Sequence, residues 1–203
     1  MIINIRGTSG TGKSTLARQL MALYEPNPLR YRREGRKQPL GYRYQHRIAR
    51  DLAVVGHYET DCGGADTITD YDDLFNLVRQ GATRGMNVLF EGLLISGDVK
   101  RTTELHQWAL NQGDVLHVVA IQLPLDECVA SVNARRKEKA ERSARVNGGD
   151  PNYRGEVNPK NTIAKHRGLT LACQRLEAEG VIVHRPQGRA EAFRVCKHLL
   201  GLP

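Results

Sequence analysis

The segment IRGTSGTGKST, residues 5–15, restricts the fold of this chain more than any other feature. Residues 7–14 match the pattern G-x-x-x-x-G-K-[ST] at every fixed position, with an apolar run before them and a helical pattern after them. Glycines let such a loop curl so that its N–H groups point inward, and the following helix adds the positive end of its dipole. The segment therefore predicts a phosphate-binding loop (P-loop) that holds a nucleoside triphosphate.

The residue types in this loop predict individual roles. Lys13 should reach the β- and γ-phosphates, and Ser14 should ligate Mg²⁺. The predicted nucleotide-binding residues are Gly7, Thr8, Ser9, Gly10, Thr11, Gly12, Lys13, Ser14 and Thr15. Glu91 ends the apolar segment NVLFE, where it can hold a Mg²⁺-bound water or orient the acceptor. Ser14 and Glu91 are thus the predicted metal-site residues.

The rest of the chain alternates between apolar runs and helical patterns. The runs at 2–5, 52–57, 87–91, 115–123 and 181–184 are continuous rather than alternating, as expected of a parallel sheet covered on both faces. Helical patterns lie at 13–24, 70–84, 99–111, 124–139, 161–179 and 190–200. This order predicts one three-layer α/β domain over residues 1–203 with five parallel strands. No apolar run approaches the roughly 18 residues of a membrane span, so we expect a cytoplasmic protein.

Positive charge gathers in two segments that do not fit the alternation. Residues 24–50 and 135–167 each carry a net charge of +6 within a chain of net charge +8. The excess favours a polyanionic partner, although solvated surface charge is the simpler alternative. Within the first segment Tyr42 and Tyr44 lie among arginines, a mixture that suits a nucleic-acid strand, although tyrosines packed under an insertion would look the same. The predicted substrate-binding residues are Arg30, Arg32, Arg33, Tyr42, Arg43, Tyr44, Glu59 and Lys160.

The second basic segment is predicted to form a mobile lid over residues 135–160. Arginines that close over a transferring phosphoryl group stabilise its charge and exclude water, which makes Arg135 and Arg136 the predicted catalytic arginines. For each of them, plain surface charge is about as good an explanation. Residues 140–158 are expected to be a loop rather than a helix, because they contain glycine, proline and many polar residues.

The segment GHYETDCGGAD, residues 56–66, is predicted to lie on the acceptor side. It follows the second parallel strand, and ligands of open α/β sheets bind at the carboxyl ends of the strands. A kinase for an alcohol benefits from a carboxylate that accepts the hydroxyl proton. Asp61 is the first choice for this base and Glu59 the second, with a simple polar turn as the alternative.

The order of these motifs resembles the nucleoside monophosphate kinase group of P-loop kinases over nearly the whole chain. That resemblance implies a five-stranded parallel sheet in the order 2-3-1-4-5, a lid, ATP as donor, and adenine near Arg135 and residues 185–189. Glu91 departs from that group, which has an Asp-Gly pair at this strand end. The segments GHYETDCGG, VLFEGLL, SVNARR and VNPKNT…KHRG are similar to bacteriophage kinases that act on 5-hydroxymethyluridine in DNA.

The narrower resemblance implies transfer of the γ-phosphate of ATP, with Mg²⁺, to the hydroxymethyl group of a base in DNA. For a phage-encoded enzyme the compartment would be the cytoplasm of the host cell. A kinase for free (deoxy)nucleoside monophosphates fits the same fold, but eight cations in residues 24–50 exceed what one monophosphate needs. A non-enzymatic nucleotide switch would not explain the acids on the acceptor side or the arginines of the lid.

Overall fold

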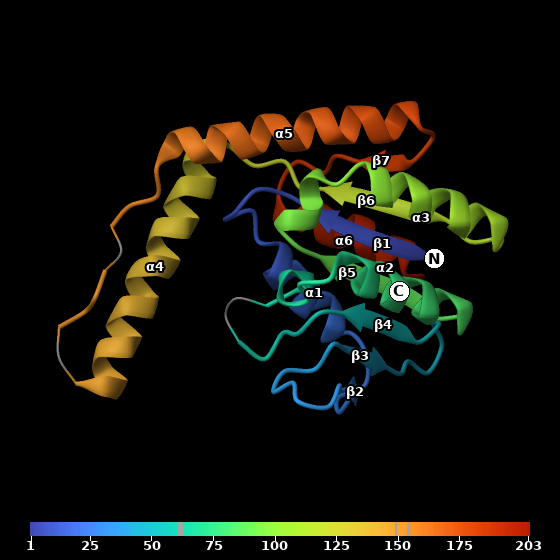
Figure 1. The fold of residues 1–203 in the computed structure, drawn as a ribbon, viewed down its shortest axis with the longest axis horizontal. Helices are drawn as coiled ribbons and strands as arrows, with labels where there is room; N and C mark the ends of the chain where they lie inside the picture. Colours follow the sequence, from blue (N-terminus) through green and yellow to red (C-terminus); the bar gives the residue numbers. More distant parts are fainter. Residues whose placement is uncertain (61–62, 149, 154) are drawn as a thin grey trace.

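The computed structural model describes residues 1–60, 63–148, 150–153 and 155–203. Over these residues one sheet has the strand order β2-β3-β4-β5-β1-β6-β7 (Figure 1). Its strands are β1 Ile2–Arg6, β2 Leu29–Tyr31, β3 Gly41–Tyr44, β4 Leu52–Val55, β5 Asn87–Glu91, β6 Leu116–Ala120 and β7 Ile182–His184. The helices are α1 Lys13–Met21, α2 Tyr71–Thr83, α3 Lys100–Asn111, α4 Leu125–Asn147, α5 Pro159–Ala178 and α6 Arg189–Leu199, with 3-10 turns η1 Ala65–Thr67 and η2 Leu94–Gly97.

The five strands expected from the sequence form the parallel part of this sheet. β4, β5, β1, β6 and β7 pair in parallel, which is the order 2-3-1-4-5 when these strands alone are counted along the chain. β1, β4 and β5 are buried along their whole length, because helices cover both faces of the sheet. The α/β prediction and the order of the parallel strands are confirmed.

The prediction of a wholly parallel, five-stranded sheet is wrong. Residues 24–50 supply two further strands, because β2 and β3 form an antiparallel hairpin and β3 pairs antiparallel with β4. Charged residues on the exposed side of these short strands hide their alternation in the sequence. Tyr42 turns inward on β3, is only 3% exposed and joins the core beside Leu52, with Tyr44 packed against the same cluster. The ring of Tyr42 is therefore not available for stacking on a base, and the packed-tyrosine alternative is the one observed.

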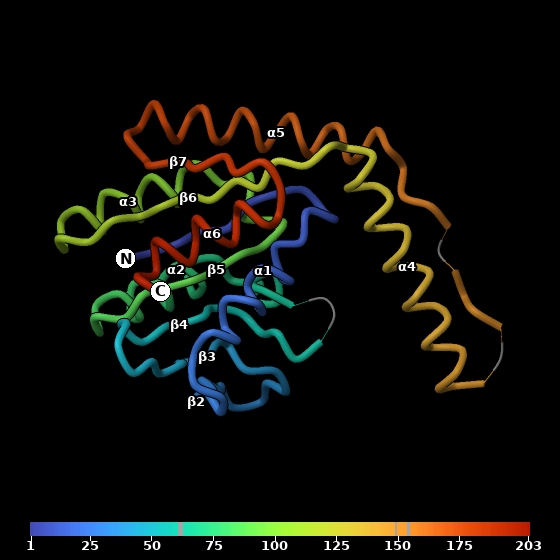
Figure 2. The backbone as a smooth tube through the Cα atoms, turned by 180° about the vertical axis from the view of Figure 1, so that it is seen from behind, coloured from blue at the N-terminus to red at the C-terminus, as the bar shows by residue number. Residues whose placement is uncertain are grey.

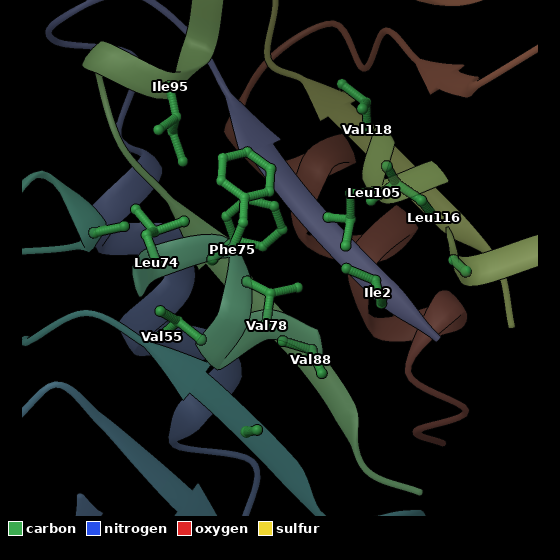
Figure 3. Close-up of a cluster of buried hydrophobic side chains, with 14 of the residues drawn as sticks. Ile2, Val55, Leu74, Phe75, Val78, Val88, Ile95, Leu105, Leu116 and Val118 are labelled. Atoms are coloured by element: carbon green, nitrogen blue, oxygen red, sulfur yellow. The ribbon is translucent and has the colours of Figure 1, made fainter. Parts of the chain in front are cut away.

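Helices cover the two faces of the sheet with separate clusters of buried side chains. α2 and α3 lie on the near face in Figure 1, and their core includes Leu74, Phe75 and Leu105 (Figure 3). α1 and α6 lie on the near face in Figure 2 and bury Leu16 and Cys196. The expected three-layer arrangement is thus present, and all five parallel strands end at the edge where the P-loop begins.

α4 forms an arm that stands out from the sheet, whereas α5 packs along the body of the protein beside β7 (Figures 1 and 2). α4 continues to Asn147, so the expectation of a loop from residue 140 is wrong for residues 140–147. These residues, AERSARVN, are mostly good helix formers, and Gly148, with a φ of 70°, follows the last helical residue. Although α4 and α5 are long, none of the helices described has a stretch apolar enough to cross a membrane.

Arg6 is an unusual residue for the last position of a buried strand. Its side chain has no exposed surface, and burial lowers the pKa of its guanidinium to about 10. The guanidinium donates hydrogen bonds to Asn4 Oδ1 (2.6 Å), to the carbonyls of Ser96 (3.0 Å) and Asp98 (2.9 Å), and to Thr102 Oγ1 (2.6 Å). Arg6 thereby ties the turn η2 to the strand that enters the P-loop.

Substitution Arg6→Leu is expected to lower the free energy of unfolding by about 3 kcal/mol, because it leaves several buried acceptors without a donor. Chemical denaturation of the purified protein measures this loss. The matched control is Arg84→Leu, since Arg84 is exposed at the end of α2 and its removal should cost less than about 0.5 kcal/mol. Equal unfolding midpoints for the two variants would contradict the role given to Arg6.

A histidine pair on β6 and β7 predicts a loss of stability in acid. His117 Nδ1 lies 3.1 Å from His184 Nε2, and burial together with His184 lowers the pKa of His117 from 6.5 to about 4. The folded state thus disfavours protonated His117, and its contribution to stability is lost as the pH falls from 6.5 towards 4. With a discount for partial exposure we expect a loss of about 1–2 kcal/mol. Urea unfolding between pH 6.5 and pH 4 measures this loss of stability. The loss should be smaller in His117→Gln than in wild type, and it should equal that of wild type in the exposed control His198→Gln.

Candidate active site

The P-loop connects β1 to α1 in the conformation that phosphate binding requires. Gly10 and Gly12 have φ angles of 89° and 90°, which side chains other than glycine rarely adopt. A Cβ at Gly10 would also collide with the carbonyl of Cys128 in α4. The Thr11 hydroxyl donates to the carbonyl of Thr8 (2.9 Å) and closes the loop on itself. The loop is therefore built from its own backbone and from close contact with α4.

Lys13 lies inside this loop. Its ammonium group donates to the carbonyls of Gly7 (2.8 Å) and Thr8 (3.1 Å), and the side chain is 7% exposed. Burial lowers the pKa of Lys13, while the negative charges of Glu91 and Asp66 act in the opposite direction. The loop thus holds the ammonium group at the place where phosphate oxygens would be bound.

Ser14 and Glu91 meet at the first turn of α1. The Ser14 hydroxyl donates to Glu91 Oε1 at 2.8 Å, and Glu91 is only 2% exposed at the end of β5. Burial raises the pKa of Glu91, opposed by Lys13 and by the Ser14 hydrogen bond. The carboxylate is walled in, because a Cβ at Gly64 would collide with it. A hydroxyl and a carboxylate side by side are the oxygen donors that Mg²⁺ prefers, so the predicted metal-site pair fits the ion.

A cleft of about 640 Å³ opens over these residues. Its P-loop side comprises Ser9, Gly10, Gly12, Lys13, Ser14, Thr15, Arg18 and Arg189. Gly63, Asp66, Glu91 and Leu93 form a second side, and Ser131, Ala134, Arg135, Glu138, Lys139 and Arg142 of α4 form the third. The structure thus brings together the P-loop, the acceptor segment and one face of the arm around a single cleft.

The acceptor segment contributes differently from what the sequence suggested. Asp61, the predicted base, lies outside the described residues, so its role stays a prediction. Glu59 accepts a hydrogen bond from Arg30 at 2.9 Å and is exposed. Asp66 lines the cleft, and its two oxygens accept hydrogen bonds from the backbone N–H groups of Leu93 (2.7 Å) and Leu94 (3.0 Å). Asp66 therefore fixes the turn η2 at the cleft edge.

Arg18 is a cleft residue that the sequence analysis did not single out. It donates to the carbonyl of Thr60 (2.6 Å), and its guanidinium lies 5.8 Å from the centre of the Tyr58 ring. Tyr58 is buried, and burial beside Glu91 raises the pKa of its hydroxyl well above 10. The sequence did contain a signal for the position of Arg18. Arg18 follows Ser14 by four residues, so the two side chains lie on the same face of the helix. Arg18 thus connects the P-loop helix to the acceptor segment.

The two predicted lid arginines point to different places. Arg135 lines the cleft. Arg136 donates to the carbonyl of Gly155 at 3.0 Å, and it is not among the described residues that line the cleft. Its neighbour Asn133 accepts from the backbone N–H of Val157 at 2.9 Å. This face of α4 therefore holds the returning chain, by which we mean residues 155–157 on the way from the tip of α4 to α5. In this structure the predicted catalytic role fits the position of Arg135 and not that of Arg136.

Arg189 joins the P-loop to the arm. Its guanidinium donates to the carbonyls of Thr11 (3.2 Å) and Gly10 (2.9 Å) and to the Ser131 hydroxyl of α4 (2.9 Å). The turn at 185–189 was expected near the adenine, but these contacts could not be read from the sequence, because 178 residues separate Arg189 from Thr11. Arg189 thus sets the position of α4 relative to the loop.

Several predicted substrate-binding arginines form ion pairs with the body of the protein. Arg30 pairs with Glu59 (2.9 Å), Arg33 with Asp73 (2.6 Å) and Arg43 with Asp51 (2.8 Å). Arg32 and Lys160 are exposed. Exposed ion pairs contribute at most about 1 kcal/mol, so a phosphate can replace such a carboxylate. Binding of substrate by these residues stays a prediction. The Arg30–Glu59 pair places β2 beside the acceptor segment.

Comparisons with known proteins show close relatives of this chain. No protein-family model matches it. It is 44% identical over 200 residues to a 5-hmdU DNA kinase of Pseudomonas phage PaMx11, which covers 98% of this chain and 96% of that protein. It is 30% identical over 146 residues to a 5-hmdU DNA kinase of Delftia phage PhiW-14, which is 66% of this chain but only 52% of the relative.

A solved structure supports the fold independently of these sequences. A protein of the PezAT chromosomal toxin–antitoxin system of Streptococcus pneumoniae matches with a TM-score of 0.50 over 94% of this chain and 68% of that chain. The two sequences are 16% identical, so the likeness concerns the fold alone.

Proposed function

The chain belongs to the family of 5-hmdU DNA kinases, and we propose that it transfers the γ-phosphate of ATP to the hydroxymethyl group of 5-hydroxymethyluridine in DNA. The observation that carries this proposal is 44% identity to a family member over 98% of the chain. A P-loop that faces an acceptor segment across one cleft supports it. Because the relatives come from phages, the proposed compartment is the cytoplasm of the infected host.

On the donor side, the P-loop amides and Lys13 are proposed to hold the phosphates of ATP. The ammonium group of Lys13 already lies within the loop and can exchange its carbonyl partners for phosphate oxygens. The first N–H groups of α1 have no partner within the helix and add to this anion site. Arg135 lines the cleft, where it can stabilise charge on the transferring group.

Ser14 and Glu91 are the residues proposed to hold Mg²⁺, directly or through water. When bound, Mg²⁺ neutralises charge on the β- and γ-phosphate oxygens. The chain contributes a preformed pair of oxygens 2.8 Å apart at the wall of the cleft, and the side chain of Glu91 is only 2% exposed. This pair ties the end of β5 to the start of α1, so the site keeps its shape between binding events.

On the acceptor side, the hydroxymethyl oxygen forms a bond to the γ-phosphorus while the bond to the bridging oxygen of ADP breaks. We assign the hydroxyl proton to Asp61, since Glu59 is paired with Arg30 and both oxygens of Asp66 already accept backbone hydrogen bonds. The modified nucleobase must leave the duplex stack, or be presented in a single strand, to reach a site at the floor of the cleft.

The proposal is tested by offering γ-labelled ATP and Mg²⁺ with three acceptors in parallel. These are DNA that contains 5-hydroxymethyluridine, the same DNA with thymine in its place, and a mixture of free nucleoside monophosphates. Label in the hydroxymethyl DNA alone is the expected result. Label in the monophosphates alone would make the chain a kinase of free nucleotides and would overturn the proposal.

A further inference from the structure

One face of α4 carries positive charge well beyond the nucleotide site. The residues of α4 that line the cleft recur every three or four positions, which places them on one face of the helix. Arg135 comes first, and Lys139 and Arg142 continue the same face towards the tip of the arm, with Glu138 as the acid among them. We call Lys139 and Arg142 the outer stripe.

The outer stripe lies too far out to be needed for the phosphates of ATP. At a rise of about 1.5 Å per residue, Arg142 lies roughly 10 Å further along the helix than Arg135. The base of α4 is fixed at the P-loop, where Ser131 accepts a hydrogen bond from Arg189. From that fixed end α4 runs outward, away from the sheet (Figure 1). The helix therefore places the outer stripe at the mouth of the cleft.

The other walls of the cleft indicate what enters there. Gly63, Asp66 and Leu93, which share the cleft with the outer stripe, belong to the acceptor segment and to the turn after β5. An acceptor base that reaches Glu91 must pass between these residues and α4, and its own strand must stay at the mouth. A DNA strand has one phosphate per roughly 3.4 Å of duplex axis, so the helix from Arg135 to Arg142 spans about three phosphates.

We propose that Lys139 and Arg142 bind the sugar-phosphate backbone of the acceptor DNA strand beside the target base. This inference rests on the proposed function and extends it from the reacting base to its flanking nucleotides. Arg136 does not belong to the outer stripe, because it donates to the carbonyl of Gly155 and is not among the described residues that line the cleft. The contacts of the outer stripe are with the backbone, so they bind DNA regardless of sequence.

The test compares the double variant Lys139→Ala, Arg142→Ala with the control Lys137→Ala. Lys137 is exposed on the same helix but is not among the described residues that line the cleft. Kinase assays measure KM for an oligonucleotide with one 5-hydroxymethyluridine, KM for ATP, and kcat. Fluorescence anisotropy measures the affinity for the same oligonucleotide at several salt concentrations.

The double variant should show a KM for the oligonucleotide raised about tenfold or more and a binding slope against log salt reduced by roughly 1.5. Its KM for ATP, its kcat at saturating DNA and all values of the control should stay within twofold of wild type. A raised KM for ATP with unchanged DNA binding would assign the outer stripe to the nucleotide. Unchanged values throughout would make it ordinary surface charge, and either result overturns the inference.

A failure of the proposed function has a different signature. In that case the wild type itself labels no hydroxymethyl DNA, whereas a failure of the outer stripe leaves the wild type active and the double variant equal to it. A mononucleotide acceptor, 5-hydroxymethyldeoxyuridine monophosphate, separates the two further. It has no flanking backbone, so its KM should be the same for the wild type and the double variant if the stripe binds the DNA strand.

Discussion

Substitution Lys13→Ala is expected to lower phosphoryl transfer at least about 1,000-fold while leaving most DNA affinity intact. The ammonium group is held inside the P-loop by the carbonyls of Gly7 and Thr8, at the position where the β- and γ-phosphates would lie. No other described cation lies within the loop itself, since Arg135 reaches the cleft from α4 and Arg189 binds the outer carbonyls of the loop. Single-turnover transfer of labelled phosphate measures the loss.

The design must separate lost chemistry from a collapsed loop. Lys13→Met keeps the length of the side chain and should lose transfer to the same extent, while both variants keep the unfolding midpoint within a few degrees of wild type. Lys100→Ala serves as control, because Lys100 is exposed at the start of α3. Anisotropy with the hydroxymethyl oligonucleotide should give similar affinities for all four proteins. Near-normal turnover of either Lys13 variant would refute the assignment of the donor site.

Substitution Glu91→Gln is expected to lower transfer about 100- to 1,000-fold without unfolding the protein. The amide keeps the shape of the carboxylate and can still accept the hydrogen bond from Ser14, but it has no charge to offer Mg²⁺. Steady-state kinetics over a range of Mg²⁺ concentrations measures the effect. The loss should shrink little at high Mg²⁺, since the carboxylate itself is missing.

The same variant has a predicted signature in stability. Burial raises the pKa of Glu91 in the folded state, so its ionisation is easier in the unfolded chain. The contribution of Glu91 to stability is therefore present in acid and is lost as the pH rises through the folded-state pKa. Compared with wild type, Glu91→Gln should gain stability in urea unfolding as the pH rises above 4.5, the ordinary pKa of a glutamate. A difference that is independent of pH would contradict the burial argument.

The donor site could be predicted from the sequence because its determinants are local. The P-loop pattern, the apolar run before it and Glu91 at the end of a buried strand each occupy a few consecutive residues. The predicted strand at 87–91 agrees with β5 in both bounds, since a continuous apolar run leaves little choice of period. The pairing of Ser14 with Glu91 then follows from the topology, because β5 lies next to β1 in the sheet.

Features that depend on contacts between distant segments could not be predicted. The hairpin of β2 and β3 was hidden by its short strands and charged outer face, and Tyr42 gave no sign that it faces the core. Arg6 looked like one more basic residue beside a glycine, yet it is bound by atoms more than 90 residues away. The separation of Arg135 from Arg136 depends on which face of α4 meets the returning chain. The residue that accepts the hydroxyl proton is the least determined part of the site, since Asp61 stays a prediction.

The most direct test of the central claim is to locate the transferred phosphate. A short DNA oligonucleotide with one internal 5-hydroxymethyluridine and a 5′-phosphate already in place is incubated with ATP and Mg²⁺, digested to nucleotides and analysed by mass spectrometry. One added phosphoryl group on the hydroxymethyl oxygen of the modified base is the result that our account predicts. An unmodified hydroxymethyl base, with phosphate transferred elsewhere or only to free nucleotides, would contradict it.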